Sequence, residues 1–360
     1  MIRFAWLQAR AQTAIAVAAL AAAAVLALVT GPRLLYLYHV DVVTCQGSAC
    51  ASATTAFLAS YRWMQVFAPP LLLVLPALFG MFWGAPLVAR ELETGTFRLA
   101  WTQSVTRKRW LAVRLGVGAL TSMAVTGLLS LVLTWWFSPI DRVQLNPLDP
   151  SVFGVRGIVP VGYAAFAFML GVTAGVLLRR TIPAMAATLV AFTAARLAVT
   201  YYVRPYLMGS LRAIAPVIMT TGTGPAPSPG AGVVKPGDWV LSDQTINGAG
   251  KVVGQYGGIG PNGNIGFQMS HGTINLVGVG PCQNAFPAAA LGGARGTSGP
   301  SAAFNAAAQE CISKLGLRDV VTYQPLSHYW PLQCYETLIF LALALALAAF
   351  CFWRVNRSLT

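Results

Sequence analysis

The residues best suited to chemistry lie between Arg90 and Trp110, where acidic and basic side chains share one short polar stretch. Glu91 and Glu93 stand near its start, and Arg107 and Arg109 near its end. Charges of both signs in one segment suit recognition of another surface through charge-assisted hydrogen bonds. We therefore predict a docking segment here.

Motifs for catalysis are absent from the sequence. It contains neither His-Glu-x-x-His nor Gly-x-Ser-x-Gly, and its three histidines have no companion pattern. Gly258 to Gly263 has dinucleotide-binding spacing, but Pro261 stands where a helix should open. A P-loop is also missing. We predict that the chain is not an enzyme, with no catalytic residues, no metal site and no cofactor of its own.

The elements that position the charged stretch must cross a membrane. Charged residues are 9% of the chain and hydrophobic residues 56%, whereas soluble domains carry about 25% charged residues. Because a bilayer core about 30 Å thick requires roughly 20 apolar residues per helix, we predict six spans. They are residues 13–30, 63–89, 115–137, 158–178, 182–203 and 337–353. The first could be a signal peptide, but five later spans favour a transmembrane helix.

The basic residues set the orientation. With a cytoplasmic N-terminus, half of the 24 Lys and Arg residues fall in four short inner segments. Their density there is about fourfold that of the outer segments, as the positive-inside rule requires. We predict a multi-pass plasma-membrane protein with both termini in the cytoplasm. Because the net charge of +14 collects at helix ends and not in one patch, we predict no nucleic-acid partner.

Residues 204–334 form the predicted extracytoplasmic domain, between residues 1–203 with the first five helices and residues 335–360 with the last. Short apolar patches such as Trp239 to Leu241 and Ile274 to Val277, set among Gly, Pro and Asn, indicate short strands. Ser301 to Leu315 fits a helix and Val320 to Tyr323 a strand. The predicted fold class is therefore an all-α six-helix membrane protein with a small, loop-rich α+β domain between helices 5 and 6.

Four cysteines lie on the predicted outer side. Cys45 and Cys50 fall in the first outer loop, and Cys282 and Cys311 in the large one. Three pairings are open to them, and we favour disulfides Cys45 with Cys50 and Cys282 with Cys311. A metal site at the first pair lacks a second pair of ligands at suitable spacing.

Two features of the spans have open interpretations. Arg196 is the single charge within a predicted span, and it could snorkel to the outer interface or line a polar pathway. The second span contains four prolines, which predict either a kinked, cavity-lining helix or a packing irregularity.

The charged stretch itself has two physical interpretations. Past Gly95, Phe97 and Trp101 fall on one helical stripe, and Thr106 fits an N-cap for the third span. An amphipathic helix lying on anionic lipid would show this pattern, and so would a helix that docks on a protein. These residues alone favour neither.

The order of short motifs resembles one protein family. Glu91-x-Glu93-x-Gly95-Thr96, followed by Gln103-Ser104-Val105-Thr106-Arg107-x-Arg109, resembles the loop between the second and third spans in permease subunits of bacterial ABC-2 type ABC transporters. Phe4 to Arg10 resembles that family's short amphipathic N-terminal helix, and Val320 to Trp330 resembles the segment before its last span. The predicted topology is also similar to the ABC-2 plan.

The resemblance implies a function and partners. The loop at residues 90–110 would be a coupling helix that receives the motion of a separate ABC ATPase subunit, in which ATP and Mg²⁺ would bind. The implied coupling residues are Glu91, Glu93, Gly95, Thr96, Arg98, Trp101, Gln103, Ser104, Arg107 and Arg109. A homodimer would export an amphipathic substrate by alternating access. A membrane-anchored sensor that binds its ligand in residues 204–334 is the alternative.

Overall fold

The structure is a computed structural model, and it describes residues 2–45, 50–94, 107–144, 147–216, 233–235, 237–246, 248–256, 310, 314, 316 and 318–358. The chain divides into two compact units. The helical unit comprises Met1–Leu207 and Ser327–Thr360, and the sheet unit comprises Met208–Leu326.

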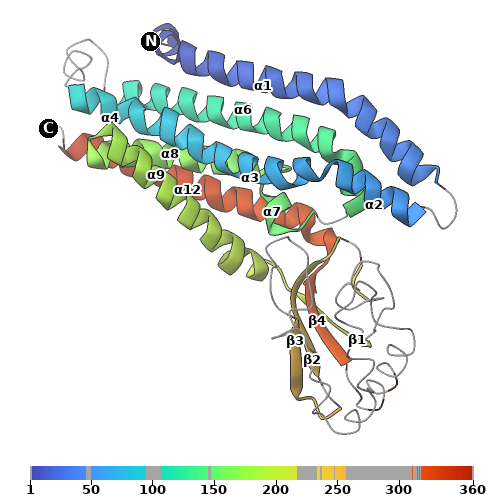
Figure 1. The fold of residues 1–360 in the computed structure, drawn as a ribbon. Helices are drawn as coiled ribbons and strands as arrows, with labels where there is room; N and C mark the ends of the chain where they lie inside the picture. Colours follow the sequence, from blue (N-terminus) through green and yellow to red (C-terminus); the bar gives the residue numbers. More distant parts are fainter. Residues whose placement is uncertain are drawn as a thin grey trace. The chain divides into compact units, whose positions relative to one another are not determined.

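Long apolar helices build the helical unit (Figure 1). The longer ones are α1 (Ile2–Tyr38), α2 (Cys50–Ser60), α3 (Arg62–Phe79), α4 (Ala85–Thr94), α6 (Arg107–Gln144), α8 (Val159–Leu178), α9 (Thr181–Ala198) and α12 (Tyr329–Ser358). Short helical segments adjoin them: η1 (His39–Val43), η2 (Gly80–Gly84), α7 (Pro150–Phe153), η3 (Val199–Val203), η4 (Arg204–Tyr206) and η8 (Leu326–His328).

Six stretches of these helices are long and apolar enough to cross a bilayer, counting only the described residues. They are Val17–Val43, Leu72–Arg90, Leu111–Val143, Val159–Leu178, Thr181–Tyr206 and Leu326–Arg354. Each overlaps one predicted span, so the prediction of six transmembrane helices is confirmed. Residues 4–10, which resemble a separate N-terminal helix in sequence, are continuous with α1.

Helix α8 forms the centre of the helical unit. It packs against α12, α6, α4, η2, α9 and α3, and 78% of its span is buried, against 44% or less for the other five. A helix that is apolar on every side suits either a protein core or a membrane span, and for α8 most of that surface is covered by the other helices of the unit. Its polar Thr173 is satisfied within the unit, since its hydroxyl donates to the Met169 carbonyl at 2.8 Å.

Glycines bring α8 and the second span into backbone contact. A β-carbon at Gly80 would lie 2.7 Å from the Ala167 carbonyl carbon, and one at Gly171 would lie 2.8 Å from the Ala85 nitrogen. Gly84 and Gly175 are equally close to the facing helix. Glycines four residues apart on both helices therefore permit an approach that any side chain would block.

The second span bends where its prolines and glycines cluster. Helix α3 runs through Pro69, Pro70 and Pro76 and passes into the wide turn η2 before α4 resumes the span. Wide turns of this kind occur often at functional sites. Leu73, Val74 and Ala77 of α3 line a cavity described below.

One end of the helical unit collects several chain ends and connections. The start of α1, the end of α12, the end of α4 and the start of α6 lie there together (Figure 1). The turn from α8 to α9 is at the same end, since Glu93 of α4 bonds to Thr181 of α9. The helix ends that flank the charged stretch thus lie on the same side of the bundle as the start of α1 and the end of α12.

The sheet unit contains four antiparallel strands in the order β1-β4-β2-β3. They are β1 (Leu211–Pro216), β2 (Trp239–Ile246), β3 (Val252–Tyr256) and β4 (Arg318–Gln324). Strands predicted at 239–241 and 320–323 are confirmed within β2 and β4. The other predicted elements at 274–277 and 301–315 lie outside the described residues, apart from helical Glu310 and Lys314.

Candidate functional site

The charged stretch joins α4 to α6. Helix α4 is described to Thr94 and α6 from Arg107, and the predicted break at Gly95 and cap at Thr106 lie outside the described residues. Glu91 lies in the last turn of α4, and Arg107 and Arg109 lie in the first turn of α6, where Arg109 is exposed. The remaining predicted coupling residues lie outside the described residues: Gly95, Thr96, Arg98, Trp101, Gln103 and Ser104.

Glu93 connects the end of α4 to the start of α9. The Thr181 hydroxyl donates to Glu93 Oε2 at 2.8 Å, and the Thr181 backbone N–H donates to the same oxygen at 3.3 Å. These hydrogen bonds lower the pKa of Glu93 below its usual 4.5, with a smaller contribution from nearby Arg180. An ionised carboxylate also suits the positive end of the α9 dipole. A shift of α4 at this end therefore acts on α9 directly.

The turn that presents Thr181 is tight. Helix α8 ends at Leu178 and is capped by Arg179, whose φ of 53° is left-handed and whose N–H bonds to the Gly175 carbonyl. Arg180 is extended, and α9 begins at the next residue with Pro183 in its first turn, where proline's missing donor is not needed. Arg180 of this turn lies near enough to the Glu93 carboxylate to favour its ionised form.

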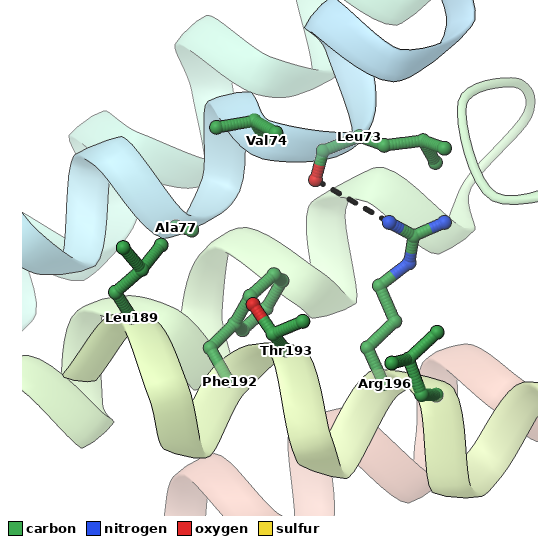
Figure 2. Close-up of a pocket in the computed structure, with 8 residues that line it drawn as sticks. Leu73, Val74, Ala77, Leu189, Phe192, Thr193 and Arg196 are labelled. Carbon is green, nitrogen blue, oxygen red and sulfur yellow. Dashed lines mark hydrogen bonds between the residues drawn. The ribbon is translucent and has the colours of Figure 1, made fainter. Parts of the chain in front are cut away.

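Arg196 lies farther along α9, beside a small cavity between α3 and α9 (Figure 2). The lining is apolar apart from Thr193 and Arg196. The Arg196 guanidinium points toward α3, where Nη1 is 3.5 Å from the Leu73 carbonyl. It also lies over the Tyr163 ring at 5.3 Å. The Arg196 guanidinium therefore packs against neighbouring helices of the unit.

A buried ion pair joins the far end of the fifth span to α12. Arg204 Nε donates to Glu336 Oε2 at 2.7 Å, and Arg204 Nη2 donates to Glu336 Oε1 at 2.9 Å. Both side chains have no exposed surface. The Tyr163 hydroxyl donates to Glu336 Oε1, and the Arg204 guanidinium stacks over the Phe153 ring at 4.2 Å. This bidentate geometry is what a buried carboxylate requires.

The ion pair corrects two predictions from the sequence. Arg196 is not the single charge within the spans, because Arg204 and Glu336 both fall inside them. Glu336 lies one residue outside the predicted last span, 337–353, but inside the observed one, because α12 begins earlier, at Tyr329. The sequence did contain a signal for this ion pair. Arg204 directly follows the fifth apolar segment, and Glu336, of opposite charge, directly precedes the sixth.

Gln333, also missed in the sequence, ties α12 to the start of α8. Its Oε1 accepts hydrogen bonds from the Ile158 and Val159 N–H groups, each at 3.1 Å. Its Nε2 donates to the Phe153 and Arg156 carbonyls, each at 3.2 Å. The side chain is fully buried, so these four bonds satisfy both the amide and otherwise open backbone groups.

The connection before α8 has an ion pair of its own. Arg156 pairs with Asp141 of α6 and lies 5.2 Å over the Phe137 ring. Burial lowers the pKa of Arg156 to about 10, so the guanidinium remains charged at neutral pH. The predicted extramembrane ends of α6 and α8 are thereby held together.

The cysteines and acidic residues show no metal centre in the part of the chain that the structure describes. Cys45 and Cys50 form a disulfide, as predicted. Cys282 and Cys311 lie outside the described residues. Cys334 is an exposed thiol and Cys351 a buried one.

Comparison with known proteins gives one match. A family model described as "ABC-2 membrane transporter related" matches residues 17–204, which is slightly more than half of the chain and contains five of its six spans. No curated protein and no solved structure matches.

Proposed function

The chain belongs to the ABC-2 membrane transporter related family, and from that premise we propose that it is the transmembrane permease subunit of an ABC transporter. The observation that carries the proposal is the family match across the first five spans. ATP and Mg²⁺ would bind in a separate ATPase subunit, since this sequence has no P-loop. Two copies of the chain would form the membrane part of the transporter.

We infer the orientation of the chain in the membrane from the end of the helical unit at which α4 ends and α6 begins. That end carries exposed Arg90, Arg109 and Arg179 among its basic residues, together with the ends of α1 and α12 (Figure 1). The positive-inside rule supports a cytoplasmic location for this end. The sheet unit, which falls between the fifth and sixth spans in the sequence, would then be extracytoplasmic.

The mechanism begins at residues 90–110. Closure of the ATPases on ATP would push this loop, and the Glu93 hydrogen bonds to Thr181 would pass the displacement from α4 into α9. Helix α9 lines the cavity at Arg196 and leads to the buried Arg204–Glu336 pair. Because an equilibrium shifts only by differential binding free energy, the ATPase must favour one packing of these helices. Export of an amphipathic substrate is the direction we propose.

Co-purification of the tagged chain with a candidate ATPase tests this function. We expect Glu91→Arg and Arg107→Glu each to abolish capture and nucleotide-stimulated ATPase activity, because each reverses a charge on the proposed docking surface. Arg142→Glu is the matched control, since it reverses an exposed arginine at the opposite end of the same helix α6. All variants must insert and elute as the wild type does. Failure of the wild-type chain to bind any ATPase would overturn the transporter proposal and favour the sensor.

A further inference from the structure

The cavity between α3 and α9 combines an apolar lining with one cation. Its volume is about 100 Å³, and Leu73, Val74, Ala77, Leu189 and Phe192 supply most of its surface. A water molecule occupies about 30 Å³ in the liquid, so the cavity has room for a small headgroup and the first carbons of a chain. Figure 2 shows the cavity with Arg196 at one end of its lining.

Arg196 differs from two other arginines of the helical unit, which each have a carboxylate partner. Arg204 is paired with Glu336, and Arg156 with Asp141. Among the described residues no carboxylate lies within ion-pair distance of Arg196, and its buried Nε has no hydrogen-bond partner. Its Nη1 makes only a long hydrogen bond, of 3.5 Å, to the Leu73 carbonyl. A guanidinium has five donors, so most of its hydrogen-bonding capacity remains open to an anion.

The rim of the cavity is bordered by exposed apolar side chains of two predicted membrane spans. Leu189, Leu197 and Val74 are substantially exposed, at 38%, 49% and 45%. An apolar chain longer than the cavity could therefore continue along these side chains into the bilayer without meeting water. A cation at one end of the lining and exposed apolar side chains at the rim select for a molecule with one charged head and one hydrocarbon tail.

We propose that this cavity binds a single-chain anionic amphiphile, with its headgroup on Arg196 and its chain along Leu73, Val74, Leu189 and Leu197 toward the bilayer. The ligand is cargo of the transporter, and that part rests on the proposed function. The headgroup would accept hydrogen bonds from Nε and Nη1 of Arg196, displacing the weak contact to Leu73. A charge-assisted pair in an apolar setting is the source of selectivity for an anion over a neutral head.

The test uses dodecanoate with a photoreactive diazirine near its carboxyl group, and the full chain in discs of zwitterionic phosphatidylcholine. We expect saturable labelling of peptides from α3 and α9. Dodecanoate should compete, while dodecanol and dodecylammonium should compete at least about tenfold more weakly, the factor expected for loss of one charged hydrogen bond. Arg196→Gln should weaken labelling by a similar factor, and Arg196→Lys should restore much of it.

Two further variants separate binding from a general structural effect. Thr193→Phe fills the cavity from its exposed side and keeps Arg196, so it should also abolish labelling. Arg142→Gln removes an exposed arginine far along α6 and should change nothing. Equal labelling in wild type and Arg196→Gln, or equal competition by dodecanol, would overturn the site.

The cargo part has its own readout. With the partner ATPase bound and trapped by vanadate, labelling at the cavity should fall, because the packing of α3 against α9 changes during transport. Labelling that meets every expectation above but is unaffected by the trapped ATPase would identify a resident lipid and overturn the cargo assignment. Labelling is measured without the ATPase, so failure of the site and failure of the proposed function are distinguishable.

Discussion

The buried pair of Arg204 and Glu336 makes a quantitative prediction about the helical unit. Removing one partner leaves the other charged, fully buried and unpaired, which costs about 3–5 kcal/mol in comparable sites. We therefore expect Arg204→Met and Glu336→Leu each to lower the free energy of unfolding by that amount. Met and Leu are chosen because they keep much of the side-chain volume and introduce no polar atom.

The double variant should be far less damaging than the sum. With both charges removed, the losses are the stacking of Arg204 on Phe153 and the acceptor of the Tyr163 hydroxyl. These are worth about 1–2 kcal/mol and about 1 kcal/mol. The double variant should thus lose about 2–3 kcal/mol, whereas additive single effects would give about 6–10 kcal/mol. The coupling free energy is then roughly 3 kcal/mol or more.

Unfolding of the purified chain in mixed micelles, titrated with SDS and followed by tryptophan fluorescence, measures all four members of the cycle. Arg142→Met is the control, because this exposed arginine should change the free energy of unfolding by less than about 0.5 kcal/mol. Single effects that add in the double variant would refute the reasoning, since they would show that the two side chains stabilise the unit independently.

Two further predictions concern packing and pH. Gly171→Leu should lower the free energy of unfolding by at least about 3 kcal/mol. Overpacking costs about 1–3 kcal/mol where only side chains must move, and here the new atoms meet backbone. Gly116→Leu is the control in the same unfolding assay, because a β-carbon at Gly116 has nothing within 4 Å. Burial and the neighbouring Asp319 raise the pKa of Asp243 from 3.8 to about 7. The folded sheet unit therefore binds the proton more tightly than the unfolded chain, so its stability is highest below pH 3.8 and falls as the pH rises toward 7. Hydrogen exchange of β2 amides in the full chain should show this loss, and Asp243→Asn should remove it; pH-independent protection in the wild type would contradict the assignment.

The six spans could be predicted because apolar length is a local property of the sequence. The ends of the spans were less accurate, and the reason is visible at α12. The predicted last span begins at residue 337, just after charged Glu336, but Arg204 pairs with Glu336 inside the unit, and the helix extends back to Tyr329. A charge limits a membrane helix only when no partner reaches it.

The site residues likewise divide into those that the sequence alone reveals and those that depend on how the helices pack. Arg196 and the charged stretch stand out by composition alone. The bonds of Glu336 and Gln333 do not, because their partners are 132 and about 175 residues away, and no local pattern specifies which helices pack together. The coupling role of Glu93 stays a prediction, and its hydrogen bond to Thr181 of α9 could not be read from the sequence because the two residues are 88 positions apart.

Helix α9 is the element where these separate observations meet. At its start, Thr181 is bonded to Glu93 of α4. From its middle to its last turn, Leu189, Phe192 and Arg196 border the cavity against α3. Beyond its end, Arg204 is locked to Glu336 of α12. A rigid helix fixed at both ends cannot shift at Thr181 without either moving its middle against α3 or straining the far ion pair. Since breaking that pair is the more expensive outcome, a displacement entering at Glu93 should be taken up mainly at the α3–α9 contact, where the cavity and the wide turn η2 offer the least resistance.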